Sequence, residues 1–123
     1  GDMVWAWSSA EQARVARAIV SVKRDLAQVV CRIEAGDHTV AGVTPDHPFF
    51  HVDTQSFVPL RDLPSDARLR GIARGQMQDV RITGLSITER PEPSVMVLNL
   101  SVEGPEHTYV AEGLLVHNKS PAT

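Results

Sequence analysis

The sequence predicts an all-β domain built from short, mostly antiparallel strands. Along most of the 123 residues, short segments rich in Val, Ile and Leu alternate with turn-forming residues, among them 8 glycines and 8 prolines. Many short strands separated by frequent turns are typical of an all-β fold. The chain contains no sequence repeat of about 20 to 50 residues, so it is not an array of repeated units.

Composition and charge exclude several classes of protein. The chain is long enough for one domain with a single core, and its 42% hydrophobic and 22% charged residues are ordinary for a globular protein. A formal net charge of -3 gives no basic surface for nucleic acid or an anionic membrane. Aromatic residues, at 5%, are too few for a base-stacking surface. No apolar run approaches the ~20 residues that span a bilayer, and the first residues lack the layout of a signal peptide.

The N-terminal part of the chain allows two interpretations. Met3 to Trp7 predicts a short strand, and Ser8 to Gln12 a polar turn. The segment from Arg14 to Val22 is rich in Ala and Arg and could form a helix capped by the preceding residues. Its Val and Ile residues are β-branched, however, and favour strands. In the strand interpretation, Lys23 to Asp25 form the turn of a long hairpin, and the local evidence does not separate the two.

The next segments read as strands joined by turns. Ala35 to His38 predicts a turn, and Thr39 to Val43 a strand. The strand leads into Thr44 to Pro48, where two prolines exclude both a helix and a central strand. Strand character returns at Phe49 to Val52.

The following stretch has the same character. Ser56 to Leu60 is short and apolar, and Leu63 to Arg68 is a connecting loop. Val80 to Thr88 alternates apolar and polar residues, as a half-buried strand does. Two prolines within Arg90 to Pro93 end that strand.

The C-terminal part predicts a hairpin. Two apolar segments, Val95 to Val102 and Tyr109 to Val116, are separated by a Glu-Gly-Pro-Glu turn. The second segment ends on His117 and Asn118, and the polar tail Lys119 to Thr123 follows. The expected strand therefore ends with an imidazole and a carboxamide on adjacent residues.

That pair suggests a specific reaction. The side-chain amide of an Asn can attack its own peptide carbonyl, close a succinimide and expel the next residue. The amide is a poor nucleophile and the amine a poor leaving group, so a proton donor is needed, and such help is typically worth ~10²–10⁴-fold. An Asn near a terminus is usually only solvated, but the preceding apolar strand and His117 favour a catalytic role for Asn118.

These motifs resemble those of a Hint domain, the self-processing fold of inteins, hedgehog autoprocessing domains and the pre-toxin modules of bacterial polymorphic toxins. The matching runs are Asn99 to Val102, His107 to Val110 and Leu115 to Asn118, together with a Thr-x-x-His motif at Thr44 and His47. The residues in the Asn99 to Val102 and His107 to Val110 runs are most similar to those of the bacterial pre-toxin modules. The resemblance covers residues 1–118 and leaves 119–123 as a tail. It implies a horseshoe of antiparallel strands with a pseudo-twofold arrangement, which favours the strand interpretation of Arg14 to Val22.

The resemblance also implies roles for individual residues. His117 would hydrogen-bond the scissile carbonyl and stabilise the developing oxyanion, while His107 would relay protons to Asn118 and the leaving amine. Thr44 and His47 would act on the peptide bond before an N-terminal nucleophile. The family places that nucleophile ahead of the Gly-Asp pair that begins this sequence. We therefore expect a domain truncated at its N-terminus, either because the segment has been trimmed or because the natural protein lacks it.

Two further residues limit the expected chemistry. Cys31, the single cysteine, excludes an internal disulfide. It cannot replace the missing nucleophile because it lies within an expected strand, where we expect it to pack as a small core hydrophobe. Splicing requires Cys, Ser or Thr directly after the Asn, and Lys119 stands there. The expected activity is therefore single-turnover cleavage of the Asn118-Lys119 bond in cis, with no cofactor, no metal and no partner.

Two other functions stay open. The domain could be an inactive Hint remnant that serves as a spacer or interaction module. Alternatively, His47 and His51, with Asp46 and Asp53 nearby, could bind a metal in a hydrolase, although Pro48 argues against the helix that would align the two histidines. The resemblance implies domains fused upstream and downstream in a bacterial secreted or surface protein. Their identity is not encoded in this chain.

Overall fold

The structure is a computed structural model that describes residues 2–8, 11, 13–90, 92, 94, 96–103, 108–111 and 113–117. The strands are β1 (Met3–Ser8), β2 (Ala13–Leu26), β3 (Val29–Ala35), β4 (His38–Val43), β5 (Pro48–His51), β6 (Ser56–Pro59), β7 (Arg68–Ala73), β8 (Gln76–Glu89), β9 (Met96–Val102), β10 (Thr108–Ala111) and β11 (Leu114–His117). A short 3-10 turn, η1 (Leu60–Asp62), follows β6. Within these ranges no segment is α-helical, and no helix is long and apolar enough to cross a membrane.

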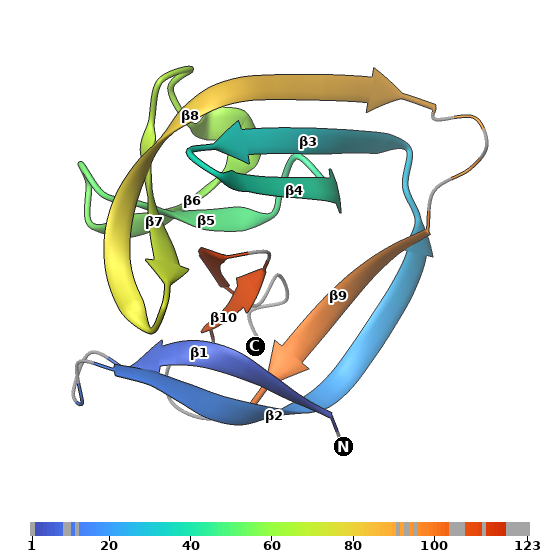
Figure 1. Cartoon of the computed structure of the whole chain (residues 1–123). Coiled ribbons are helices and arrows are strands. Elements are labelled where there is room, and N and C mark those ends of the chain that lie inside the picture. The colour runs from blue at the N-terminus through green and yellow to red at the C-terminus, as the bar shows by residue number, and fades with distance from the viewer. Residues whose placement is uncertain are drawn as a thin grey trace.

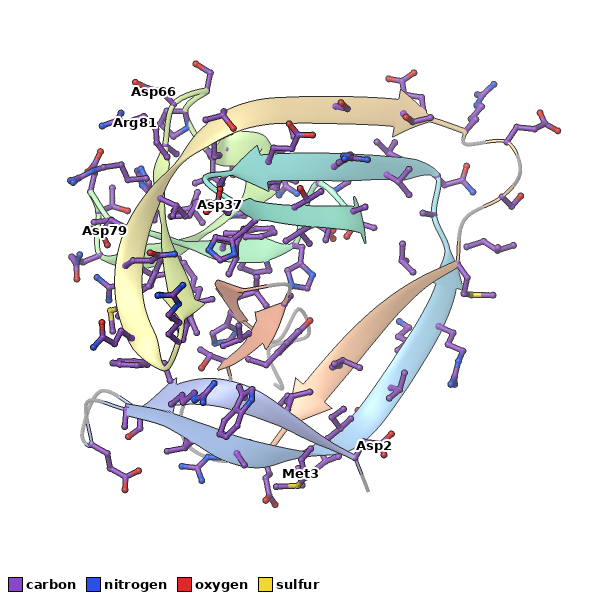
Figure 2. All side chains as sticks on the ribbon, viewed as in Figure 1. Asp2, Met3, Asp37, Asp66, Asp79 and Arg81 are labelled. Atoms are coloured by element: carbon purple, nitrogen blue, oxygen red, sulfur yellow. The ribbon has the colours of Figure 1, made fainter. Side chains whose placement is uncertain are left out.

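The strands form two antiparallel sheets. A three-stranded sheet has the order β1-β2-β9, and a larger sheet runs β10-β11-β5-β7-β8-β3-β4, with β6 paired to β5. Figure 1 shows the two sheets curled into a horseshoe with β10 in its middle. Charged side chains such as Asp66, Asp79 and Arg81 lie on its exposed outer side (Figure 2). The predicted all-β fold is confirmed.

Short turns join several neighbouring strands. Gly36 and Asp37 connect β3 to β4, as the sequence predicts, and Gly36 has a φ of 57°. Arg74 and Gly75 connect β7 to β8, with φ values of 54° and 75°. The two consecutive positive φ angles of Arg74 and Gly75 match the twist of a two-residue hairpin, so this turn fixes the register of β7 and β8.

The strand interpretation of Arg14 to Val22 is confirmed, but the predicted hairpin turn at Lys23 to Asp25 is wrong. These residues continue β2 and pair with β9, Lys23 opposite Asn99 and Arg24 opposite Leu98. The Lys23 and Arg24 side chains are exposed, so they remain in water while the β9 ladder satisfies the backbone. Strand β3 then enters the other sheet and pairs with β4 and β8.

The predicted C-terminal hairpin is also wrong. The first apolar segment is β9, which pairs with β2. The second segment, predicted as one strand, folds back on itself as β10 and β11, with Tyr109 opposite Val116. Gly113 has a φ of 87°, a conformation that L residues with a side chain rarely adopt. That glycine lets the chain reverse within what looks like a continuous apolar run.

The β10-β11 hairpin separates two hydrophobic clusters. Residues of a strand alternate between its two faces, and Leu114 and Val116 point into the main core with Phe49. On the other face, Leu115 packs with Trp7 and Ile72 in a second cluster. The members of the second cluster and its half-buried neighbours are Trp7, Ile72, Leu115, Phe50, Phe57, Met77 and Val110. Both faces of the hairpin are therefore covered.

The prediction that Cys31 packs as a core residue is confirmed. It lies on β3 and is 3% exposed. Burial raises the pKa of its thiol, which lowers the fraction of reactive thiolate.

An imidazole packs against the reversal between β10 and β11. A Cβ atom added at Gly113 would overlap the His38 ring, and one added at Gly71 would lie 3.2 Å from His38 Nε2. The third neighbour is Gln78, whose side-chain nitrogen is 3.1 Å from the same Nε2 atom. The ring therefore sits close to backbone that only glycine leaves accessible.

We expect Gly113→Ala to destabilise the fold more than Gly42→Ala. Gly42 also has a positive φ, 70°, but no heavy atom of the described residues lies within 4 Å of its added Cβ. Gly42→Ala should therefore cost only the backbone strain, about 1–3 kcal/mol, while Gly113→Ala adds overpacking of about 1–3 kcal/mol. Urea unfolding measures both values.

His38→Ala in the Gly113→Ala background is the control, because it removes the overlapping ring and should recover the overpacking part alone. Equal losses for the two glycine variants would contradict the packing account.

Candidate functional site

A cavity of ≈ 390 Å³ lies beside Thr44 and His47. It is lined by Val40, Ala41, Gly42, Val43, Thr44, His47, Phe49, Met96, Val97, Leu100, Tyr109, Ala111 and Val116. Strands β4 and β9 approach each other here but do not pair, since β4 pairs with β3 and β9 with β2. Among the described strands, each therefore has one edge with no paired strand, and these two edges border the cavity.

Backbone bonds fix the loop that carries Thr44 and His47. The His47 N–H donates to the Thr44 carbonyl at 3.1 Å, closing a turn, and Thr44 Oγ1 donates to Asp46 Oδ1 at 2.7 Å. Two bonds tie the loop to the start of η1: Leu60 N–H donates to the His47 carbonyl at 3.0 Å, and Arg61 N–H to the Pro45 carbonyl at 2.8 Å. The predicted loop is confirmed, and its two motif residues share one cavity.

Tyr109 and Phe49 are aromatic neighbours of His47, and Tyr109 also offers it a hydroxyl. The Tyr109 hydroxyl lies 3.5 Å from His47 Nε2, at the outer limit of a hydrogen bond, and the two rings meet edge to face with centroids 6.3 Å apart. His47 is 5% and Tyr109 6% exposed. Burial raises the pKa of Tyr109 to about 12. Its phenol is therefore neutral at physiological pH and can donate to the His47 ring. Tyr109 belongs to the His107 to Val110 motif, but the sequence alone predicts no role for it.

His117 lies at the end of β11, on the other face of the hairpin. Its ring packs edge to face on Phe57, with centroids 5.0 Å apart, whereas Tyr109 and His47 lie on the face of the main core. The backbones are close, because Val116 pairs with Phe49 and β5 begins directly after His47. The structure thus places His47, in the loop directly before β5, close to His117 on β11 along the backbone, with their rings on opposite faces.

Not every predicted site residue can be placed. His107 and Asn118 lie outside the described residues. The convergence of Thr44, His47, His107, His117 and Asn118 on one junction therefore stays a prediction.

His51 has a local partner in a turn. It is 6% exposed on β5, and its Nδ1 atom lies 3.0 Å from Thr54 Oγ1, which is 2.8 Å from Ser56 Oγ. Its Nε2 atom is buried and has no hydrogen-bond partner in the described structure. The arrangement holds the turn between β5 and β6.

The carboxylates named for a metal site have other partners. Asp46 accepts the Thr44 hydroxyl, and Asp53 accepts Arg68 Nε at 2.9 Å. The hydrogen bond from Arg68 lowers the pKa of Asp53. Among the described residues, no group of three or more His, Cys, Asp or Glu side chains could hold a metal ion.

We expect chelation to leave the melting temperature unchanged. A structural metal contributes its binding free energy to folding, so removing one would destabilise the domain strongly. Thermal melts with and without EDTA make the measurement, and melts with added zinc serve as the control. A large drop on chelation would favour the hydrolase hypothesis based on His47 and His51.

Tyr109 should make folding stability fall at high pH. Burial raises its pKa from the ordinary value of 10.0 to about 12 in the folded protein, so the unfolded chain loses the proton first as pH rises. The free energy of unfolding therefore keeps the full contribution of the neutral, buried phenol below pH 10. That contribution is lost as the pH rises toward about 12.

Tyr109→Phe should remove this part of the pH dependence, and urea unfolding at several pH values compares it with wild type. Tyr109 is the one tyrosine of the chain, so phenolate absorbance reports it alone. Half-ionisation of the folded protein near the ordinary value would contradict its burial.

Comparison with known proteins identifies the fold. No family model and no curated protein sequence matches the chain. Among solved structures, the chain is similar to the bacterial intein-like domain from Clostridium thermocellum, with a TM-score of 0.78 and 22% identity over 96% of this chain and 82% of that one. It is also similar to the DnaB intein from Synechocystis sp. PCC 6803, with a TM-score of 0.79 and 19% identity over 94% and 77%.

A third similar structure is the TvoVMA intein, with a TM-score of 0.81 and 18% identity over 94% of this chain and 69% of that one. Identities at this level establish the fold alone. The chain therefore has the Hint fold of inteins and bacterial intein-like domains.

Proposed function

We propose that the chain is an intein-like self-processing domain that cleaves the Asn118-Lys119 peptide bond by cyclisation of Asn118. The observation that carries this proposal is the position of His117. It ends a strand held at the centre of the Hint fold, its ring is packed against Phe57, and it directly precedes Asn118 in the sequence. A proton donor next to a cyclising Asn is the element that this slow reaction requires.

The proposed reaction is balanced without a co-reactant. The side-chain amide nitrogen of Asn118 attacks its own carbonyl carbon, forming a five-membered succinimide. The bond from that carbon to the Lys119 nitrogen breaks. A proton lost by the amide nitrogen is transferred to the departing amine, with His107 as relay. His117 donates a hydrogen bond to the carbonyl oxygen, where negative charge develops.

The residue after Asn118 limits the outcome to cleavage. Lys119 offers no hydroxyl or thiol to accept a migrating chain, and Ser120 comes one residue later. We therefore assign residues 1–118 to the processing domain and 119–123 to the released tail.

Thr44 and His47 belong to a separate step in this proposal. The cavity that they line is bordered by the open edges of β4 and β9. An extended segment placed there could pair with either edge, as in strand addition. We propose that this cavity receives the segment that carries an N-terminal junction. The bacterial pre-toxin resemblance suggests that such a domain is fused to others and releases one of them.

A second candidate function is a Hint-fold spacer or interaction module without activity. The observation that favours it is the placement of the His47 and His117 rings on opposite faces of the β10-β11 hairpin. Rings so placed cannot both approach one peptide bond from the same side. The cleavage experiment separates the two functions.

We expect slow release of the peptide Lys119 to Thr123, followed over days by intact mass spectrometry. Asn118→Ala removes the attacking amide and should abolish release. His117→Ala should slow it by about 10²–10³-fold, the usual effect of losing one oxyanion donor. Thr44→Ala should leave the rate unchanged, because it serves the other step.

The product provides an internal check, since a C-terminal succinimide is one water lighter than the Asn or isoAsn into which it hydrolyses. Equal cleavage of wild type and Asn118→Ala would mean ordinary proteolysis. Equal persistence of both would identify the inactive module.

A further inference from the structure

Thr108 carries a buried hydroxyl that forms no hydrogen bond with any described residue. The residue begins β10 and is 6% exposed. Its Oγ1 atom is buried and has no hydrogen-bond partner in the described part of the chain. Buried polar groups are nearly always bonded, and an unpaired one calls for an explanation such as a catalytic role.

The position of Thr108 relates it to His117. The two residues are direct partners in the antiparallel β10-β11 ladder. Such partners point to the same face, with Cβ atoms about 4.5–5.5 Å apart. At that separation, rotation about the side-chain bonds can bring a hydroxyl and a ring nitrogen to hydrogen-bond length without moving either strand.

An aromatic column supports the same imidazole. The His117 ring meets Phe57 at 5.0 Å with an interplanar angle of 63°, and Phe57 meets Phe50 at 5.2 Å and 77°. Arg70 Cζ lies 4.4 Å above the Phe50 ring. Offset and edge-to-face contacts of this kind are directional, so the column restricts the orientation of the His117 ring.

A neutral imidazole has one donor and one acceptor nitrogen, and the partner of one nitrogen decides which of them carries the proton. For the proposed cleavage, the nitrogen facing the scissile carbonyl must carry it. The other nitrogen then acts as a hydrogen-bond acceptor. Among the neighbours described, Thr108 offers an uncommitted O–H on the same face.

We propose that Thr108 is a positioning residue for His117: its hydroxyl donates to one ring nitrogen and keeps the proton on the nitrogen that serves the Asn118-Lys119 junction. This inference rests on the proposed function and adds the residue that sets the tautomer. Thr108 acts through His117 and does not contact the reacting atoms.

Substitution by valine separates this role from a structural one. Thr108→Val keeps the shape of the side chain and removes the hydroxyl. Because that hydroxyl has no partner among the described residues, its loss should leave the melting temperature unchanged or higher. Peptide release should nevertheless slow about tenfold, the usual worth of one hydrogen bond in a transition state. Thr108→Ser keeps the hydroxyl and should restore most of the rate.

The matched control is Thr88→Val, which makes the same change at an exposed position on β8. It should alter neither release nor melting. Release of the C-terminal peptide by Thr108→Val at the wild-type rate would overturn the proposal, as would a rate for Thr108→Ser as low as that of Thr108→Val.

A second readout does not depend on cleavage. Nitrogen-15 NMR of the histidine rings, recorded in the Asn118→Ala background so that the chain stays intact, reports which nitrogen of His117 is protonated. We expect one dominant tautomer with Thr108 and a mixture with Thr108→Val. Identical spectra would overturn the proposal. If wild type and Asn118→Ala prove equally inert, the proposed function fails, and the tautomer measurement alone decides the role of Thr108.

Discussion

Burial of both faces of the β10-β11 hairpin is the constraint on which the rest of the structure depends. Leu114 and Val116 enter the main core, and Leu115 enters the second cluster. The backbone of β11 is meanwhile paired to β10, β5 and β7. The two sheets curl around this hairpin, which gives the horseshoe of Figure 1.

This arrangement divides the candidate site into two environments. On the face of the main core, His47 and Tyr109 are shielded from water, and the cavity opens between two strand edges. On the face of the second cluster, the His117 ring contacts Phe57 and has Thr108 as its ladder partner. Under the proposed function, each face holds the groups for one peptide junction, so each histidine has its own set of neighbours.

Local chemistry explains what could be predicted from the sequence. Pro45 and Pro48 allowed one interpretation of the Thr44–His47 loop. β-branched residues favoured strands, but at Arg14 to Val22 they did not exclude a helix, and only the resemblance to Hint domains did. Pairing partners were harder, because β9 pairs with β2, a strand far away in the chain, and an adjacent segment looked equally suitable. Gly113 is a turn signal between β10 and β11, but it stands within a continuous apolar run, which predicted a single strand. The relation of Phe57 and Thr108 to His117 depends on register and face, which no local pattern encodes. His107 and Asn118 lie outside the described residues.

The edges of β4 and β9 that no other described strand covers also bear on aggregation. An unpaired strand edge is a template on which another chain can add, and natural proteins cover or distort such edges to avoid aggregation. Here the two strands approach across the cavity, so each stands in the way of a foreign strand reaching the other. Any change that widened the cavity would expose both strand edges to pairing with another chain at once.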